Sequence, residues 1–305
     1  MLRKNTIKLI LKALVFITIS TPVLANTYKH SLGTIEVEGT PQRVVVLGFG
    51  SLDFVDALGV TPVAMPKKLL PARLAKYQAD EFVNTGSLQE VDYETLFTIK
   101  PDLIIAEARM AQLYKDLAEI APTYMFQINS KNYWESTQEH WKNISQILDK
   151  EEQGLALIKD IQTRIDKLHT DKNGKSLSAL TVMSNGNNIT SFGPDSRFSF
   201  IYHEAGFKPS ASNNVASNTL PHGNLISFEY IADAKPDTLL ILDRDQAIGN
   251  NEGQAKKLFD NPLIASTPAG KNNKIVYLDP TAWYLVAGGY HSLQTMISDL
   301  ESALH

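Results

Sequence analysis

The stretch YETLFTIKPDLIIAEAR, residues 93–109, returns 135 positions later as FEYIADAKPDTLLILDR, residues 228–244. Five identities fall in register: Glu94 with Glu229, Lys100 with Lys235, Pro101 with Pro236, Asp102 with Asp237 and Arg109 with Arg244. Each copy places a Lys-Pro-Asp turn before a short apolar run, as in a turn that leads into a buried strand. One such turn is ordinary, but five matches at one offset predict two similar units in a single chain.

The repeat continues upstream of both stretches. Residues 51–62, SLDFVDALGVTP, and residues 196–209, SRFSFIYHEAGFKP, each read as a helix that closes with Gly-x-x-Pro. Each follows a short apolar run, VVVL at 44–47 and SALTVM at 178–183. Alternation of apolar strands with helices is typical of a parallel sheet covered on both faces. The sequence therefore predicts two doubly wound α/β lobes.

A different pattern separates the lobes. Between residues 134 and 169 apolar residues recur with a 3.6-residue period, no proline interrupts them, and the single glycine is Gly154. This spacing predicts one long helix of roughly 30 residues, about 45 Å in length at 1.5 Å per residue. We therefore expect an N-terminal α/β lobe at residues 26–132, a connecting helix at 133–170 and a C-terminal α/β lobe at 171–305.

The first 25 residues do not fit this fold. Arg3, Lys4, Lys8 and Lys12 give a basic start, ALVFITIS is a short apolar run, and TPVLA ends on small residues. We interpret residues 1–25 as a secretory signal peptide that is cleaved after Ala25. A membrane anchor is the alternative, but the apolar run is shorter than the ~20 residues that span a bilayer. We expect an exported, soluble protein.

Composition narrows the possible functions. The chain contains no cysteine, which excludes disulfides, thiolate metal sites and a lipid anchor on cysteine. Residues 1–25 carry four positive and no negative side chains, so their removal takes the formal net charge from −4 to −8. An acidic exported protein is a poor candidate for nucleic-acid binding.

Three arginines occupy positions that suit a ligand site. In open α/β sheets, ligands bind beyond the carboxyl ends of the strands. Arg109 follows the apolar run LIIA, and Arg244 follows LLIL. Arg197 follows FGPDS at the expected start of a helix, where anions are favoured. Any one arginine is more often a solvated surface residue, but three that face one cleft predict an anion site.

Two further side chains are expected at the same cleft. Tyr284 lies in DPTAWYLVAGG, just beyond the strand KIVYL, and His222 lies in the loop NTLPHGNLIS. A tyrosine beside tryptophan usually serves packing, and a loop histidine usually faces solvent. A phenolate oxygen and an imidazole nitrogen together, however, suit two coordination positions of a cation such as Fe(III).

Motifs of common enzyme classes are missing. There is no Walker A sequence and no G-x-S-x-G, and HEAGF is not H-E-x-x-H. LGFGSLD has Asp53 where the third glycine of a dinucleotide fingerprint belongs. The other histidines lack the spacing of zinc ligands. The sequence therefore gives no support to the enzyme classes that these motifs mark.

With these features the chain resembles a known family. The opening GTIEVEGTPQRVVVLG, the paired Lys-Pro-Asp units and the long connecting helix resemble the substrate-binding proteins of iron-siderophore and vitamin B12 ABC importers. The segments SFGPDSRF, LPHG, LILDR and YLDPTAWYLVAGG are similar to motifs of the members that bind ferric catecholates. The resemblance covers essentially the whole mature chain and implies a class III periplasmic binding protein.

The resemblance also implies roles for the site residues. Arg109, Arg197 and Arg244 correspond to an arginine trio that neutralises the trianionic ferric catecholate. His222 and Tyr284 correspond to a pair that coordinates Fe(III) directly when the siderophore supplies only four oxygens. The segment NTLPHGN departs from the simpler THG form of the family, which makes the coordination by His222 the weaker part of this correspondence.

Partners follow from the same resemblance. Glu94 and Glu229 correspond to two glutamates, one per lobe, that dock onto arginines of an inner-membrane ABC permease, which works with its ATPase. From the residues alone they are acidic groups at helix starts, which are common without any partner. We expect a monomer without a cofactor in the periplasm of a Gram-negative bacterium, with a ferric siderophore as its ligand.

Two alternatives stay open. A haem or a corrinoid is another possible cargo of the same fold, because tyrosine and histidine serve as axial ligands. A periplasmic enzyme that acts on an anionic substrate is the alternative from a different class. The sequence does not decide which catecholate is bound, whether tetradentate or hexadentate forms are preferred, or how tight the binding is.

Overall fold

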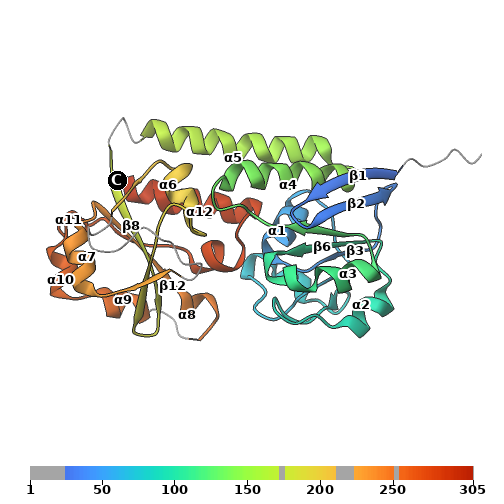
Figure 1. Ribbon diagram of the computed structural model, residues 1–305, viewed down its shortest axis with the longest axis horizontal. Coiled ribbons are helices and arrows are strands. Elements are labelled where there is room, and N and C mark those ends of the chain that lie inside the picture. Colours follow the sequence, from blue (N-terminus) through green and yellow to red (C-terminus); the bar gives the residue numbers. More distant parts are fainter. Residues whose placement is uncertain (1–24, 172–175, 211–222, 251–253, 305) are drawn as a thin grey trace, which may run out of the picture.

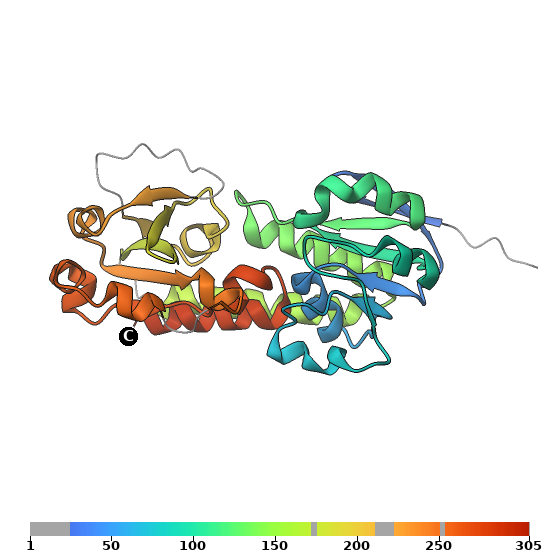
Figure 2. The same cartoon turned by 90° about the horizontal axis from the view of Figure 1, so that it is seen from below.

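Two α/β lobes lie side by side along the long axis of the molecule, and a layer of helices runs across both (Figure 1). The computed structural model describes residues 25–171, 176–210, 223–250 and 254–304. Figure 2, turned by 90°, shows that each lobe has its own sheet. The expected signal peptide lies outside the described residues except for Ala25. Within the described ranges no helix has both the length and the apolar character of a membrane span.

The N-terminal lobe is built on a fully parallel sheet of five strands. The strand order is β5-β4-β3-β6-β7. The strands are β3 (Val44–Val46), β4 (Ala64–Met65), β5 (Val83–Asn84), β6 (Leu103–Glu107) and β7 (Thr123–Phe126). An antiparallel hairpin precedes them, β1 (Ala25–His30) and β2 (Gly33–Glu38). The helical segments are α1 (Phe49–Ala57), η1 (Ala72–Gln78), α2 (Tyr93–Ile99), η2 (Ala108–Leu113) and α3 (Tyr114–Ile120).

The C-terminal lobe has a mixed sheet. Its order is β11-β9-β8-β12-β13, with β10 also paired to β8. The strands are β8 (Ser178–Asn185), β9 (Asn188–Phe192), β10 (Lys208–Pro209), β11 (Asn224–Ile226), β12 (Thr238–Asp243) and β13 (Ile275–Tyr277). The pairs β8/β9 and β9/β11 are antiparallel, so the expectation of a purely parallel sheet is wrong for this edge. The Asn-Gly dipeptide at 185–186 begins a tight β8–β9 hairpin, for which it is a strong signal.

Short helices surround this second sheet. In the described ranges they are α6 (Ser199–His203), α7 (Phe228–Ala234), α8 (Arg244–Ala247), α9 (Gln254–Phe259), α10 (Pro262–Ser266) and α11 (Pro268–Lys271). A π-helical turn, η3 (Thr281–Leu285), leads to the last long helix, α12 (Tyr290–Leu304). Most of these segments are only one or two turns long, so their positions depend on packing rather than on intrinsic helical stability.

The repeated Lys-Pro-Asp unit has the same local geometry in both lobes. Lys100 ends α2 and Lys235 ends α7, and both adopt the left-handed conformation, with φ of 51° and 46°. The proline that follows each lysine cannot continue the helix. The chain therefore turns sharply at the same point in each copy, directly before β6 and β12.

The aspartate of each unit anchors a neighbouring strand. Asp102 accepts hydrogen bonds from the backbone N–H groups of Gln42 (2.7 Å) and Arg43 (2.8 Å), just before β3. Asp237 accepts one from the backbone N–H of Ser178 (2.9 Å), at the start of β8. Because β6 pairs with β3 and β12 with β8, the two aspartates fix corresponding registers. The sequence repeat is thus a structural repeat.

The connecting region consists of two helices where we expected one continuous helix. They are α4 (Tyr133–Ile147) and α5 (Glu151–Asp171), and the break falls at Asp149, whose φ is 54°. The helices fold back on each other closely, because a Cβ on Gly154 would lie 1.9 Å from Ser145 Oγ. α5 is the long helix that spans both lobes, and α4 lies beneath it over the N-terminal lobe (Figure 1).

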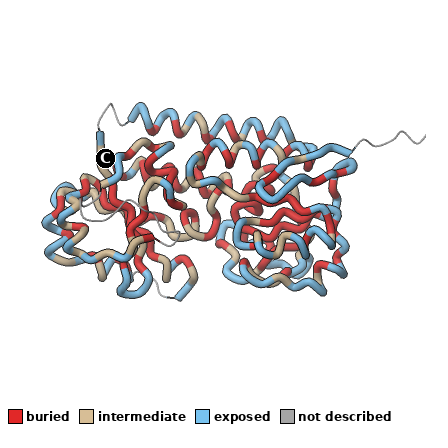
Figure 3. The backbone as a smooth tube through the Cα atoms, in the orientation of Figure 1, coloured by how far each residue is buried: buried red, intermediate tan, exposed pale blue. Residues whose placement is uncertain are grey.

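The two lobes share a hydrophobic core. One continuous cluster of buried side chains runs from the N-terminal lobe through α4 and α5 to the C-terminal lobe, and two further clusters lie within single lobes. Figure 3 shows the buried backbone continuing between the lobes. At the centre, Trp141 stacks on Phe54 at 4.5 Å and donates a hydrogen bond to the Gly288 carbonyl (2.9 Å). The lobes are therefore not independent domains.

Glycines make close approach possible where the lobes meet. A Cβ on Gly50, in the N-terminal lobe, would lie 2.1 Å from the Ala287 carbonyl oxygen of the C-terminal lobe. A Cβ on Gly288 would lie 2.6 Å from Ile128 and 2.9 Å from the ring of Phe126, and the φ of Gly288 is 81°. The Ala-Gly-Gly segment at 287–289 is thus one point at which the C-terminal lobe closely contacts the N-terminal one.

Two buried histidines predict the pH dependence of stability. Burial lowers the pKa of His30 and of His140 below the ordinary value of 6.5. The unfolded chain therefore binds protons that the folded protein does not. Stability from these groups is complete above about pH 6.5 and is lost as the pH falls, by up to about 1.4 kcal/mol per pH unit for His140. Thermal melting at several pH values measures this loss.

The variant His140→Gln separates this effect from general acid denaturation. It should flatten the fall in melting temperature below about pH 6.5. His169→Gln, at an exposed position near the end of α5, is the matched control and should leave the slope unchanged. If the melting temperature of His140→Gln falls with pH as steeply as that of the parent protein, His140 is not the source of the pH dependence.

Candidate functional site

Three arginines from three different elements surround one tyrosine between the lobes. Arg109 follows β6 of the N-terminal lobe, while Arg197 precedes α6 and Arg244 opens α8 in the C-terminal lobe. Tyr284 lies on the π-helical turn η3. The carboxyl ends of β6 and β12 thus place two of the arginines, as the topology of open α/β sheets requires. The structure brings these four predicted site residues together.

The three guanidinium groups all approach the ring of Tyr284. Their central carbons lie 5.4 Å (Arg109), 4.5 Å (Arg197) and 5.8 Å (Arg244) from the ring centroid. Cations at such distances from an aromatic ring are attracted by its quadrupole. The ring therefore offsets part of the repulsion among three like charges.

Hydrogen bonds to Tyr284 hold the same cluster. Its carbonyl oxygen accepts from Arg109 Nη2 (3.2 Å) and from Arg197 Nη2 (3.0 Å), so one backbone oxygen binds an arginine from each lobe. Its phenolic oxygen accepts from Arg244 Nε (3.0 Å). Arg244 Nη1 in turn donates to Asn185 Oδ1 (3.0 Å), in the β8–β9 hairpin. Sequence reasoning missed Asn185, although its Asn-Gly turn marks the hairpin.

Among the described residues no carboxylate forms an ion pair with these arginines, although the charge of Arg109 partly offsets the rise that burial causes in the pKa of Glu107. None of the ion pairs among the described residues involves Arg109, Arg197 or Arg244. Arg197 Nε is buried without a hydrogen-bond acceptor. Burial, and next the charge of Arg109, lower the pKa of Arg197. A buried charge is normally paired, so the guanidinium of Arg197 could accept an anion from outside the chain, and the exposed Arg109 lies where it could contact the same anion.

The same charges act on Tyr284. Burial alone raises the pKa of its phenol, but the hydrogen bond from Arg244 and the positive charges of the three arginines outweigh burial and lower it below 10. The phenolate is the form that binds a hard metal ion. The cluster therefore makes the phenolate form of Tyr284 easier to reach, which is what its predicted role as an oxygen ligand requires.

A cavity of about 540 Å³ opens beside the cluster on the C-terminal lobe. Three members of its wall are Arg197, Arg244 and Tyr284, and the remainder is neutral: Met183, Asn185, Asn188, Thr190, Phe192 and Leu225. Leu225 is 72% exposed. A smaller cavity of about 60 Å³ reaches the N-terminal lobe at Leu69 and Arg109. Ligand sites commonly combine such an apolar wall with a few fixed polar groups.

The second predicted metal ligand, His222, lies outside the described residues. Its role therefore stays a prediction. The described residues contain no cluster of three or more histidine, cysteine or acidic side chains that would hold a metal ion on its own. Any iron at Tyr284 must therefore bring most of its ligands with it.

Glu94 and Glu229 lie at the start of the repeated unit, one in each lobe, fifteen positions before Arg109 and Arg244. Both are exposed in the first turn of α2 and α7. Asp92 and Ser227 provide the N-caps, by accepting from the backbone N–H groups three positions on. A hydrogen bond from Ser227 lowers the pKa of Glu229. Neither glutamate takes part in an ion pair with another described residue, so both are free for a partner.

Comparisons with known proteins agree on one family. The model of the family described as "Periplasmic binding protein" matches residues 44–282. The petrobactin-binding protein YclQ of Bacillus subtilis is 37% identical, over 91% of this chain and 88% of that protein. The ferric-anguibactin-binding protein FatB of Vibrio anguillarum is 31% identical, over 92% and 87%. The catecholate-siderophore binding protein VctP of Vibrio cholerae superposes with a TM-score of 0.87 at 39% identity, over 92% and 100%.

The environment of Tyr284 predicts an early tyrosine titration. Burial raises the pKa of several other tyrosines, Tyr133 and Tyr202 among them, whereas that of Tyr284 is lowered. Tyrosinate absorbance should therefore begin to rise below pH 10, and Tyr284→Phe should remove this first step. Tyr93→Phe, on the exposed face of α2, is the control and should leave it in place. An onset unaffected by Tyr284→Phe would show that the arginines do not act on this phenol.

Proposed function

The chain belongs to the periplasmic binding protein family, and from that premise we propose that it captures a ferric catecholate siderophore between its lobes. It then delivers the complex to an ABC importer and performs no catalysis. The arginine cluster carries this proposal. Three guanidinium groups without a carboxylate match the three negative charges of an iron tris-catecholate, and charge-assisted hydrogen bonds to its oxygens are strong.

Tyr284 extends the proposal to siderophores that leave part of the Fe(III) coordination sphere unfilled. A siderophore with two catecholates supplies four oxygens and leaves two positions of octahedral Fe(III) open. The phenolate of Tyr284 occupies one of them, and His222 is proposed for the other. The lowered pKa of Tyr284 supports this role, because less free energy is needed to remove the phenolic proton.

The neutral cavity on the C-terminal lobe suits the organic part of the cargo. Asn185 and Asn188 offer amide donors and acceptors, while Phe192 and Leu225 offer apolar surface. A chain that links catecholates through amides fits such a wall. A polycarboxylate cargo fits this wall less well, because the carboxylate charges would lie against apolar groups.

Haem and corrinoids remain the second class of cargo. Tyr284 could serve as an axial ligand to the metal of a haem or of a corrinoid. The same fold could hold either cargo. Three uncompensated arginines nevertheless favour a more highly charged cargo. A periplasmic enzyme is disfavoured by the comparisons, because the relatives are binding proteins for iron-siderophore complexes.

We further propose the setting in which this takes place. Residues 1–25 direct export and are removed after Ala25, which leaves a soluble monomer in the periplasm of a Gram-negative bacterium. Its partners are the ferric siderophore and an inner-membrane permease with its ATPase. We propose that it binds no nucleic acid. The mature chain then comprises the lobes 26–132 and 171–305 with the connecting segment 133–170.

A binding panel tests the proposed cargo. The purified protein is titrated with ferric catecholate, ferric hydroxamate, ferric citrate and haem, while tryptophan and tyrosine fluorescence is followed. Only the catecholates are expected to bind at sub-micromolar concentration. A preference for any of the other three would overturn the proposal.

Variants then locate the site. Arg244→Gln should weaken catecholate binding by about 10- to 100-fold, because one charge-assisted contact is lost. Tyr284→Phe should weaken tetradentate complexes and leave a hexadentate one unchanged. Arg164→Gln, whose guanidinium pairs with Glu301 away from the cleft, is the control and should bind normally. Equal losses for both kinds of complex in Tyr284→Phe would exclude direct coordination.

We propose that Glu94 and Glu229 dock onto the permease. Their equivalent positions support this, because a permease with two similar halves meets one exposed glutamate from each lobe. Loss of both in Glu94→Ala/Glu229→Ala should lower siderophore uptake at least about tenfold. Cargo affinity should stay the same, because neither residue lines the cavities at the arginine cluster.

Uptake by cells that depend on this protein, together with fluorescence titration of the purified variants, measures the two effects separately. Asp233→Ala, an exposed acidic position on the same helix as Glu229, is the matched control. If the double variant supports normal uptake, or if Asp233→Ala is equally defective, the docking role is wrong.

A further inference from the structure

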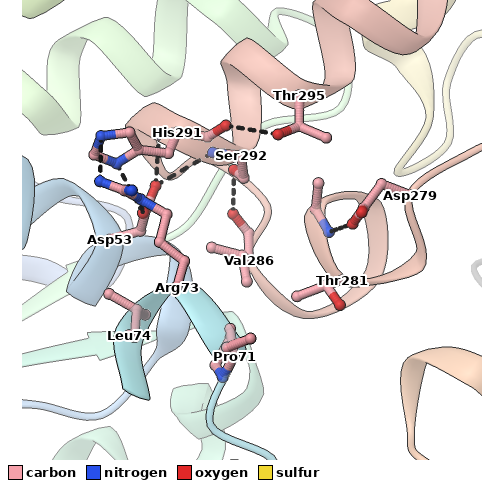
Figure 4. A pocket seen from close by; sticks show the side chains of 12 residues that line it. Asp53, Pro71, Arg73, Leu74, Asp279, Thr281, Val286, His291, Ser292 and Thr295 are labelled. Atoms are coloured by element: carbon pink, nitrogen blue, oxygen red, sulfur yellow. Dashed lines mark hydrogen bonds and ion pairs between the residues drawn. The ribbon is translucent and has the colours of Figure 1, made fainter. Parts of the chain in front are cut away.

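The first turn of α12 receives a carboxylate from the opposite lobe. Asp53, in α1 of the N-terminal lobe, accepts hydrogen bonds at Oδ2 from the backbone N–H groups of His291 (2.7 Å) and Ser292 (3.3 Å). These are among the N–H groups that a helix cannot satisfy internally. Figure 4 shows Asp53 facing this turn of the C-terminal lobe. Asp53 thus caps a helix of a lobe other than its own.

Two further side chains, those of Arg73 and His291, complete the environment of Asp53. Its Oδ1 lies 3.1 Å from His291 Nδ1 and 3.5 Å from Arg73 Nε, and Arg73 also contacts His291 Nε2. Asp53 itself is only 1% exposed. The helix N-terminus and Arg73 together offset the cost of burying its charge. This is a specific arrangement rather than a chance surface contact.

A second carboxylate makes the reciprocal contact. Glu204 follows α6 in the C-terminal lobe, and its Oε1 accepts from the backbone N–H of Trp134 (2.9 Å), in the first turn of α4. The residue at the N-cap position of α4, Asn132, makes no side-chain capping bond. α4 packs on the N-terminal lobe, where Trp141 stacks on Phe54. A residue of the C-terminal lobe therefore supplies the cap that α4 lacks.

Both capping contacts adjoin the arginine cluster. Arg197 and Glu204 flank the five residues of α6, so a shift of Glu204 moves Arg197 with it. Tyr284 is joined to α12 by the short segment 286–289, so a shift of the α12 N-terminus moves Tyr284. Arg109 donates to the Tyr284 carbonyl across the lobes (3.2 Å), so this contact is sensitive to the angle between them.

We propose that Asp53 and Glu204 are positioning residues that fix the angle between the lobes and thereby the spacing of the arginines. Two caps that cross the interface in opposite directions resist both a twist and an opening, which a single cap does not. The link to cargo affinity rests on the proposed function, whereas the effect on the lobe angle does not.

Distance measurements test the effect on the angle. The chain contains no cysteine, so Lys115→Cys and Lys271→Cys, at exposed positions on α3 and α11, give one label in each lobe. The distance distribution between spin labels at these sites should shift or broaden in Asp53→Ala and in Glu204→Ala. The shape-conserving variants Asp53→Asn and Glu204→Gln keep an acceptor oxygen and should restore most of the parent distribution.

Affinity for a ferric catecholate, measured well below the melting temperature of every variant, provides the second readout. It should fall at least about tenfold in each alanine variant and recover in the amide variants. Asp92→Ala is the matched control: Asp92 also caps a helix by accepting from a backbone N–H, but that helix, α2, is in its own lobe. Asp92→Ala should lower the melting temperature without changing the distances or the affinity.

The two readouts separate the possible failures. Unchanged distances in both alanine variants would overturn the positioning role, whatever cargo the protein binds. Changed distances with no catecholate binding in the parent protein would leave the positioning role intact and overturn the proposed cargo. An equal loss of affinity in Asp92→Ala would reduce Asp53 and Glu204 to ordinary contributors to stability.

Discussion

The shared core between the lobes is the constraint on which the other features depend. Trp141 fills it from α4, stacks on Phe54 and donates to the Gly288 carbonyl, and Gly288 leaves no space for a side chain. Because protein interiors are close-packed, this contact between the lobes does not deform continuously. The arginines of the two lobes are therefore held at one spacing, and α5 reinforces it over about 32 Å of helix.

That rigidity explains how three like charges lie together although none of them forms an ion pair with a described carboxylate. A flexible pair of lobes would relieve their repulsion by moving apart. Here the Tyr284 carbonyl binds Arg109 and Arg197 at once, and the ring faces all three guanidinium groups. The ring and the carbonyl of Tyr284 therefore offset part of the repulsion among the three guanidinium groups.

Local sequence signals were sufficient for the lobes and for the arginines, because strand ends and Lys-Pro-Asp turns are determined within a few residues. Local signals were insufficient for the helix break at Asp149, because the apolar period continues through it. The overlooked signal was the acidic pair Glu151 and Glu152, which is typical of the first turn of a helix. The contact of Asp53 with His291 joins positions 238 residues apart. No local pattern encodes such a pairing, and the same holds for Glu204 and Trp134.

The position of α12 has a consequence for the order in which the molecule can be completed. α12 is the last helix among the described residues, yet it contributes Leu293, Met296, Ile297 and Leu300 to the core that also contains residues of α1. The N-terminal lobe therefore lacks part of its interior until α12 has been synthesised and packed. Stable folding of either lobe is thus coupled to a helix that comes late in the chain, rather than proceeding lobe by lobe.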